Sequence, residues 1–180
     1  MKQIFLAGFG GQGIQFSGKF LAYAGMLQGL HVSVFPSYGP ESRGGTSSCG
    51  VVISEEPVAS PVVLTPDIFI CMNLPSLDKF ENTLAKNGTL YIDSTLVTRK
   101  STLTNANVHY IPATKLAYDN NLTGSANMIM VGKVIRESAL CPHEFIPQAM
   151  KGVVSERRKD MFELNLKAIE IGLHFITEGE

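Results

Sequence analysis

The feature that most constrains the fold is a short apolar run that ends in a cluster of glycines near the start of the chain. The segment QIFLAG, residues 3–8, is typical of a buried strand, and the glycines of GFGGQG follow it directly. From Gln15 to Gln28 the apolar residues fall on one helical stripe. A second strand is expected over residues 31–35, closed by Pro36. This order predicts a β-α-β unit with a right-handed crossover.

The rest of the chain alternates strands with helices and then becomes helical. Strands are expected at residues 46–54, at 67–72, in TLYIDS and in VHYIP. A helix is expected in PSLDKFENTLAKNG, with Pro75 near its start and Gly88 just past its end. From about Ala113 helices are expected, above all in SANMIMVGKVIRESA and FELNLKAIEIGLHFI. The alternation predicts an α/β fold, a Rossmann-like and mostly parallel sheet with flanking helices. The length of 180 residues predicts one domain over residues 1–180.

The charge and composition of the chain exclude some classes of binding partner. A net charge of −1 provides no basic field for nucleic acid. No window approaches the ~20 apolar residues of a membrane-spanning helix, and no cleavage site follows a long apolar core. We therefore expect a cytoplasmic protein with no membrane or nucleic-acid partner. A hydrophobic content of 44% beside 17% charged residues predicts an exposed apolar surface that partner chains cover, and a two-fold homodimer when the chain is isolated.

The sequence contains no recognisable catalytic group or set of metal ligands. Its cysteines, Cys49, Cys71 and Cys141, lie far apart and form no C-x-x-C pair. The four histidines are scattered, with no partner at catalytic or ligand spacing. FSGK does not complete a P-loop, because Lys19 is followed by Phe20. The isolated chain is expected to hold no iron, flavin or thiamine diphosphate.

The glycines Gly8-x-Gly10-x-x-Gly13 have the spacing of a dinucleotide site. Such a site also needs an acidic residue at the end of the second strand, and VSVFPSYGP contains none. NAD or FAD binding is therefore disfavoured. Three interpretations stay open: a tight turn without a ligand, a site for another phosphate or carboxylate at the start of the helix, and a subunit contact.

A second loop, PSYGPESRGGTS, is expected beside the first. It leaves the carboxyl end of the second strand, the edge at which open α/β sheets bind ligands. Arg43, which glycines follow, can bind a phosphate or carboxylate through two hydrogen bonds, and Tyr38 can stack or donate a hydrogen bond. A connection without a ligand is the open alternative.

Two asparagines lie near the expected ends of elements. Asn73 ends a strand at the same edge, either as a turn former or as a polar contact to a ligand or partner. In GSANMIMVGK, Ser125 or Asn127 is expected to begin a helix, and core packing is the favoured role of that segment because its residues are mainly apolar.

These motifs together resemble the gamma subunit, or gamma domain, of the 2-oxoacid:ferredoxin oxidoreductases. The resemblance is carried, in family order, by GFGGQGIQFSGKFLAYA, PSYGPESRGGTSSCGVVIS, PDIFICMN, YIPATKLA and SANMIMVGKV. GGQG followed by PSYGPExRGG is its specific part. The stand-alone length resembles that of multi-subunit enzymes for 2-oxoglutarate or branched 2-oxoacids such as ketoisovalerate, and pyruvate enzymes carry a similar module.

The resemblance implies a complex that decarboxylates a 2-oxoacid on thiamine diphosphate with Mg²⁺, passes electrons through iron–sulfur clusters to ferredoxin, and releases CO₂ and an acyl-CoA. It places these cofactors in alpha, beta and ferredoxin-like delta partners. This chain is then expected to be structural, without catalytic residues, and to form part of the coenzyme A site. The alternative is a free-standing nucleotide-binding enzyme or regulator. The residues expected to contact the coenzyme are Gly10, Gly11, Gln12, Gly13, Tyr38, Glu41, Arg43, Gly44 and Asn73.

Overall fold

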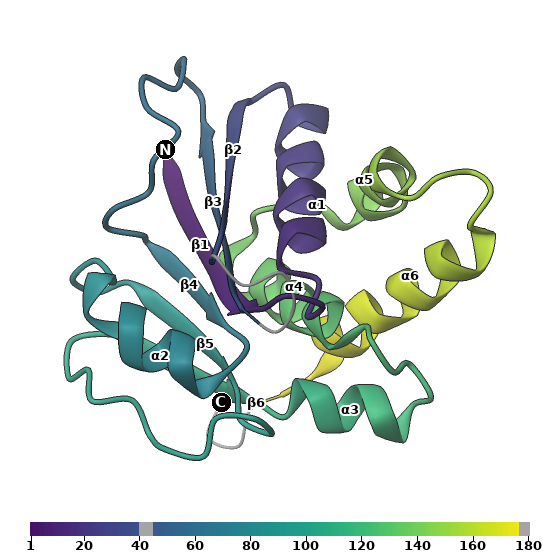
Figure 1. The fold of residues 1–180 in the computed structure, drawn as a ribbon. Helices are drawn as coiled ribbons and strands as arrows, with labels where there is room; N and C mark the ends of the chain where they lie inside the picture. Colours follow the sequence, from purple (N-terminus) through teal and green to yellow (C-terminus); the bar gives the residue numbers. More distant parts are fainter. Residues whose placement is uncertain (40–44, 177–180) are drawn as a thin grey trace.

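A six-stranded sheet in the order β2-β3-β1-β4-β5-β6 forms the centre of the molecule (Figure 1). The computed structural model describes residues 1–39 and 45–176. The neighbours β1, β4, β5 and β6 are parallel, whereas β3 is antiparallel to both β1 and β2. The predicted α/β fold with a mostly parallel sheet is confirmed. The strands are β1 (Lys2–Phe9), β2 (His31–Tyr38), β3 (Thr46–Ser54), β4 (Ile68–Cys71), β5 (Thr89–Asp93) and β6 (Asn107–Ile111).

The first two strands run in the same direction, but β3 lies between them. Residues Lys2 to Phe9 of β1 pair with Ile53 to Thr46 of β3, and β3 in turn pairs with β2 as a hairpin. The prediction that Pro36 closes the second strand is wrong, because β2 continues through it to Tyr38. The edge position of β2 explains this, since a proline there can direct its missing N–H away from the neighbouring strand.

The helices cover the two faces of the sheet unequally. Helices α1 and α4 pack on one face, whereas α2 lies on the other (Figure 1). The helix expected between Pro75 and Gly88 is shorter, because the Ala85 N–H donates a hydrogen bond to the Pro66 carbonyl (2.9 Å) and the chain turns back toward the sheet. The helical elements are α1 (Ile14–Leu27), α2 (Leu74–Phe80), the 3-10 turn η1 (Glu81–Thr83), α3 (Ala113–Asp119), α4 (Ala126–Ser138), the 3-10 turn η2 (His143–Phe145), α5 (Ile146–Val153) and α6 (Lys159–His174).

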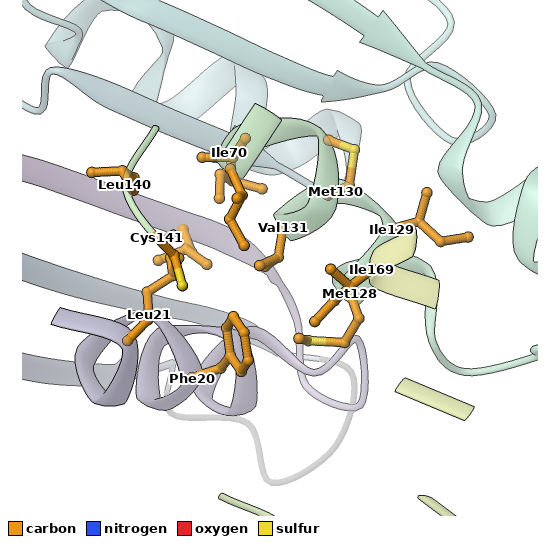
Figure 2. Packing of buried hydrophobic residues seen from close by; sticks show 14 of the residues in the cluster. Phe20, Leu21, Ile70, Met128, Ile129, Met130, Val131, Leu140, Cys141 and Ile169 are labelled. Carbon is orange, nitrogen blue, oxygen red and sulfur yellow. The ribbon is translucent and has the colours of Figure 1, made fainter. Parts of the chain in front are cut away.

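The larger of two apolar clusters lies between the sheet and helices α1, α4, α5 and α6. Figure 2 shows Phe20 and Leu21 of α1 together with Met128 and Val131 of α4 in this cluster. Residues 127–135 of α4 are all buried, and most of them are apolar, so this part of the helix is covered on every side. The dense packing fixes the start of α4 against the start of α1, which is where the glycine loop lies.

Helices α4 and α6 cross at a point where neither has a side chain. A Cβ atom added to Gly132 would overlap the backbone carbonyl of Ile169, and one added to Gly172 would overlap the carbonyl of Ile129. The two backbones therefore approach as closely as a helix pair can. Only glycine fits at either position unless the helices move apart.

A buried carboxylate fastens the loop after β5 to the turn that follows α2. Glu81 is 3% exposed; its carboxylate accepts hydrogen bonds from Arg99 Nη2 (2.8 Å), Ser101 Oγ (2.6 Å) and the Thr102 N–H (2.6 Å). Burial alone would raise the pKa of Glu81, but these hydrogen bonds outweigh it and hold the pKa below its ordinary value. The ionised carboxylate is thus the form that the fold stabilises.

We expect Glu81→Gln to lower the free energy of unfolding by about 2 kcal/mol at pH 7, because a hydrogen-bonded charge contact is lost. A carboxyl group with a lowered folded pKa stabilises the protein above its unfolded pKa and loses that contribution as the pH falls. The difference between variant and wild type should therefore shrink as the pH drops from about 5 to 3. Urea unfolding at several pH values measures this.

The matched control is Asp78→Asn, which removes the exposed partner of Arg99 (2.7 Å). Exposed ion pairs contribute little, so this change should lower stability by less than ~1 kcal/mol. A pH-independent effect of Glu81→Gln would contradict the stabilising role of its charge.

Candidate functional site

The two motif loops meet at the carboxyl edge of the parallel strands. The Gly10 N–H, just after β1, donates a hydrogen bond to the Gly45 carbonyl, just before β3 (3.0 Å). The hairpin is closed nearby by the Gly39 N–H, which donates to the Thr46 carbonyl (2.6 Å). The predicted meeting of the loops is therefore confirmed. Glu41, Arg43 and Gly44 lie outside the described residues, and their expected contacts stay predictions.

Gln12 holds the glycine loop against the end of β4. Its side-chain Oε1 accepts hydrogen bonds from the Phe9 N–H (2.7 Å) and from Asn73 Nδ2 (3.1 Å), while its Nε2 donates to the Met72 carbonyl (3.1 Å). Asn73 also caps α2, since its Oδ1 accepts from the Ser76 N–H (2.9 Å). The structure thus brings Gln12 and Asn73 together, with each amide bonded to the protein itself.

Gly13 links this loop to α4. Its φ of 75° is left-handed, and its carbonyl accepts a hydrogen bond from Asn127 Nδ2 (3.2 Å), which also donates to Ser17 Oγ (2.9 Å). A Cβ atom on Gly13 would overlap the Asn127 amide. Gly13 is the N-cap of α1 and has no side chain to cap it, so the first N–H groups of the helix are directed toward this edge.

A pocket of about 290 Å³ opens between the glycine loop and helices α3 and α4. Gly11, Gln12 and Met72 form one side, and Ala117, Tyr118 and Asn127 form the other. Every described residue that lines it is uncharged. The carboxyl edge therefore offers a small and mostly apolar pocket whose polar groups are amides, hydroxyls and backbone.

Other hollows lie away from this pocket. One of about 660 Å³ is at the opposite edge of the parallel strands, around Thr89, Asn107 and His109. Tyr38 is 69% exposed at the end of β2 and lines a separate groove of about 350 Å³ with Phe35. We place the candidate site at the carboxyl edge because both motif loops converge there, although the opposite hollow is larger.

Exposed apolar residues lie around the candidate site, as the composition predicted. Tyr118 of α3 is 75% exposed, and Leu96 beside it and Phe9 at the end of β1 are partly exposed. Surface apolar groups around a pocket are typical of a site that a ligand or another chain covers. What covers them here stays a prediction.

Asp93 is a residue at this edge that the sequence analysis missed. It ends β5 with no exposure, and its carboxylate accepts hydrogen bonds from the Thr95 N–H (3.1 Å), the Thr114 N–H (3.2 Å) and Thr114 Oγ1 (2.5 Å). These bonds fix the start of α3, which forms a wall of the pocket. The available signal was the single acidic residue in TLYIDS, at the carboxyl end of a strand.

The cysteines are buried and free of disulfides. Burial raises the pKa of the Cys71 thiol to about 12 and those of Cys49 and Cys141 to about 11. They are therefore protonated near neutral pH and poor nucleophiles. Within residues 1–39 and 45–176 no three His, Cys, Asp or Glu side chains gather as metal ligands. None of the helices described has both the length and the apolar character needed to cross a membrane.

Comparison with known proteins shows one family over nearly the whole chain. The family model for pyruvate ferredoxin/flavodoxin oxidoreductase matches residues 3–175. A ketoisovalerate oxidoreductase subunit VorA from Methanothermobacter thermautotrophicus is 38% identical over 97% of this chain, which spans only 36% of that relative. The 2-oxoglutarate synthase subunit KorC of Methanocaldococcus jannaschii is 36% identical over 98% of this chain and 95% of its own length.

Solved structures share the fold. The gamma subunit of a keto/oxoacid ferredoxin oxidoreductase from Geobacter sulfurreducens has a TM-score of 0.80 and 27% identity, covering 96% of both chains. A 2-oxoglutarate:ferredoxin oxidoreductase from Magnetococcus marinus, with 2-oxoglutarate, coenzyme A and succinyl-CoA bound, has a TM-score of 0.85 at 22% identity over 96% of this chain and 31% of its own. From the family match, the relatives and the fold together, this chain belongs to the pyruvate ferredoxin/flavodoxin oxidoreductase family.

Proposed function

We propose that this chain is the gamma subunit of a thiamine diphosphate-dependent 2-oxoacid:ferredoxin oxidoreductase complex, in which it helps to bind coenzyme A. Support comes from the 2-oxoglutarate synthase subunit that matches it over almost its full length. The Magnetococcus marinus enzyme of the same fold binds coenzyme A and succinyl-CoA. The 2-oxoacid is 2-oxoglutarate or a branched 2-oxoacid such as ketoisovalerate, since relatives of both kinds match this chain.

The observation that carries the proposal is the hydrogen bond between Gly10 and Gly45, which joins the two motif loops beside the pocket. A coenzyme with phosphates at one end needs positive groups, and the loop that Gly45 closes contains Arg43. The start of α1 adds N–H groups that favour a negative charge. The chain would thus position the coenzyme, while the acyl group is formed in other subunits.

The cofactors of such a complex do not fit the described part of this chain. An iron–sulfur cluster needs cysteine thiolates grouped around it, whereas Cys49, Cys71 and Cys141 are protonated and do not gather with other ligand residues. We assign the clusters, thiamine diphosphate and Mg²⁺ to alpha, beta and ferredoxin-like delta partners. The role of this chain is to bind and orient, with no catalytic residue of its own.

The test is Arg43→Ala in the assembled complex. The variant should raise the KM for coenzyme A about 30- to 150-fold, because losing one desolvated charged contact costs ~2–3 kcal/mol, or should weaken assembly if the loop is a subunit contact. The half-reaction of the 2-oxoacid with the thiamine cofactor should be largely unchanged. Steady-state kinetics with varied coenzyme A, and co-purification with the partners, measure the two effects.

The control is Lys86→Ala, which removes a positive charge at the opposite edge of the sheet. It should change neither assembly nor the KM for coenzyme A. If Arg43→Ala behaves like Lys86→Ala, the loop is only a connection. If the chain alone binds NAD(H), FAD or ATP and co-purifies with no partner, the free-standing alternative holds instead.

A further inference from the structure

The pocket beside Gly11 has a chemistry different from that of a phosphate site. Its described lining is uncharged, which suits a neutral occupant better than a phosphate. Met72, Leu96 and Ala117 give it apolar walls. At about 290 Å³ it is at the lower end of the size range of small-molecule pockets, so it fits one segment of a coenzyme rather than a whole one.

Asn127 lines this pocket and also the neighbouring hollow around Leu164. Its Nδ2 donates to the Gly13 carbonyl, which can only accept, so the orientation of the amide is fixed with the nitrogen on that side. Asn127 is only 5% exposed, and no residue that the structure describes donates a hydrogen bond to its Oδ1. The oxygen is still accessible, since it is not among the fully buried polar atoms without a partner, so it can accept from an occupant that carries an N–H or O–H group.

Two glycines open the backbone to the same pocket. Gly11 and Gly124 both line it, with left-handed φ values of 100° and 94°. At both positions the space where a Cβ atom would stand has no neighbour within 4 Å. An occupant can therefore lie directly against the main chain, where it meets peptide N–H and C=O groups.

We propose that this pocket binds the uncharged arm of coenzyme A, in which amide groups alternate with short aliphatic segments, while the phosphates lie outside it. Asn127 Oδ1 accepts an amide N–H of the arm, and its methylene groups pack on Met72, Leu96 and Tyr118. This assignment rests on the proposed function, because it specifies which part of the coenzyme this chain binds.

Two fragments of the coenzyme test the assignment in the assembled complex, as competitive inhibitors against coenzyme A. N-ethylpantothenamide represents the amide arm without its thiol, and adenosine 3′,5′-bisphosphate represents the charged end. Ala126→Leu fills the pocket from the start of α4, and Tyr118→Ala removes an exposed wall with little effect on folding. The control is Leu164→Ala, in a neighbouring hollow that also borders Asn127.

Ala126→Leu should weaken inhibition by N-ethylpantothenamide at least tenfold and raise the KM for coenzyme A by a similar factor. Tyr118→Ala should act in the same direction more weakly. Neither variant should alter inhibition by the bisphosphate, and Leu164→Ala should change nothing. Arg43→Ala should show the converse pattern, with the bisphosphate affected and the amide probe unaffected.

The outcomes separate this assignment from the proposed function. If Arg43→Ala raises the KM for coenzyme A but both pocket variants leave both inhibitors unchanged, the assignment is wrong and the function stands. If the pocket variants instead release a partner subunit with coenzyme A kinetics intact, a segment of that partner occupies the pocket and the assignment is overturned. If no variant affects coenzyme A kinetics or inhibition, and Arg43→Ala also leaves assembly intact, the proposed function itself fails.

Discussion

Gly132→Ala is expected to lower the free energy of unfolding by about 4 kcal/mol, more than any other single change considered for this chain. The added methyl group meets the backbone carbonyl of Ile169 in α6, which cannot rotate away as a side chain can. Helices α4 and α6 must separate, and overpacking a tight contact typically costs ~1–3 kcal/mol even where side chains can adjust. Urea unfolding followed by circular dichroism measures the loss.

Gly152→Ala provides the matched control in α5. There the three atoms nearest to the added Cβ all belong to the ring of Tyr23, a partly exposed side chain that can move toward solvent. Alanine is the better helix former by ~1 kcal/mol, which offsets part of the cost of moving the ring, so this variant should lose far less stability than Gly132→Ala. Equal losses at the two positions would show that the crossing of α4 and α6 is not limited by the backbone.

The second large effect is expected for Gly13→Ala, at about 3–4 kcal/mol. A left-handed φ costs an L-residue ~1–2 kcal/mol. The new methyl group also displaces the Asn127 amide, which loses hydrogen bonds to Gly13 and Ser17 worth ~1 kcal/mol each. Because the turn is distorted, the KM for coenzyme A in the complex should rise as well.

Gly29 serves as the control that measures only the cost of a left-handed backbone at an L-residue. Its φ of 74° matches the 75° of Gly13, and no atom lies within 4 Å of the position of its Cβ. Gly29→Ala should therefore cost only ~1–2 kcal/mol and leave coenzyme A kinetics unchanged. In an Asn127→Ala background the cost of Gly13→Ala should fall to the same value. If it stays at about 3–4 kcal/mol, contact with Asn127 is not the source of the extra loss.

Local sequence patterns predicted the bounds of an element well where those bounds depend only on residues close together in the sequence. The strand expected at residues 46–54 is β3 with the same bounds, because it is a nearly unbroken buried run between a glycine loop and polar residues. The convergence of the glycine loop and the second loop was also predictable, since β1 and β2 run in the same direction. The order β2-β3-β1 was not, because pairing partners depend on the whole sheet.

The candidate site was only partly predictable, because its contacts also depend on how distant parts of the chain pack together. Gln12 and Asn73 were expected at one edge, but their mutual hydrogen bond depends on the register of β1 against β4. Asn127 was expected to begin a helix or pack in the core, since an apolar pattern shows that a helix is buried but not what it faces. Its contact with Gly13 joins residues 114 positions apart and follows from the docking of α4 on α1.

The insertion of β3 between β1 and β2 also affects the order of events while the chain is being synthesised. β1 emerges first, yet its two neighbours in the sheet, β3 and β4, follow some 40 to 60 residues later. The β2–β3 hairpin needs only a short loop closure and can form early, so β1 is then captured by a preformed edge. The glycine loop thus acquires its final shape only after the hairpin has docked, and nascent chains shorter than β3 should show no protected amides in β1.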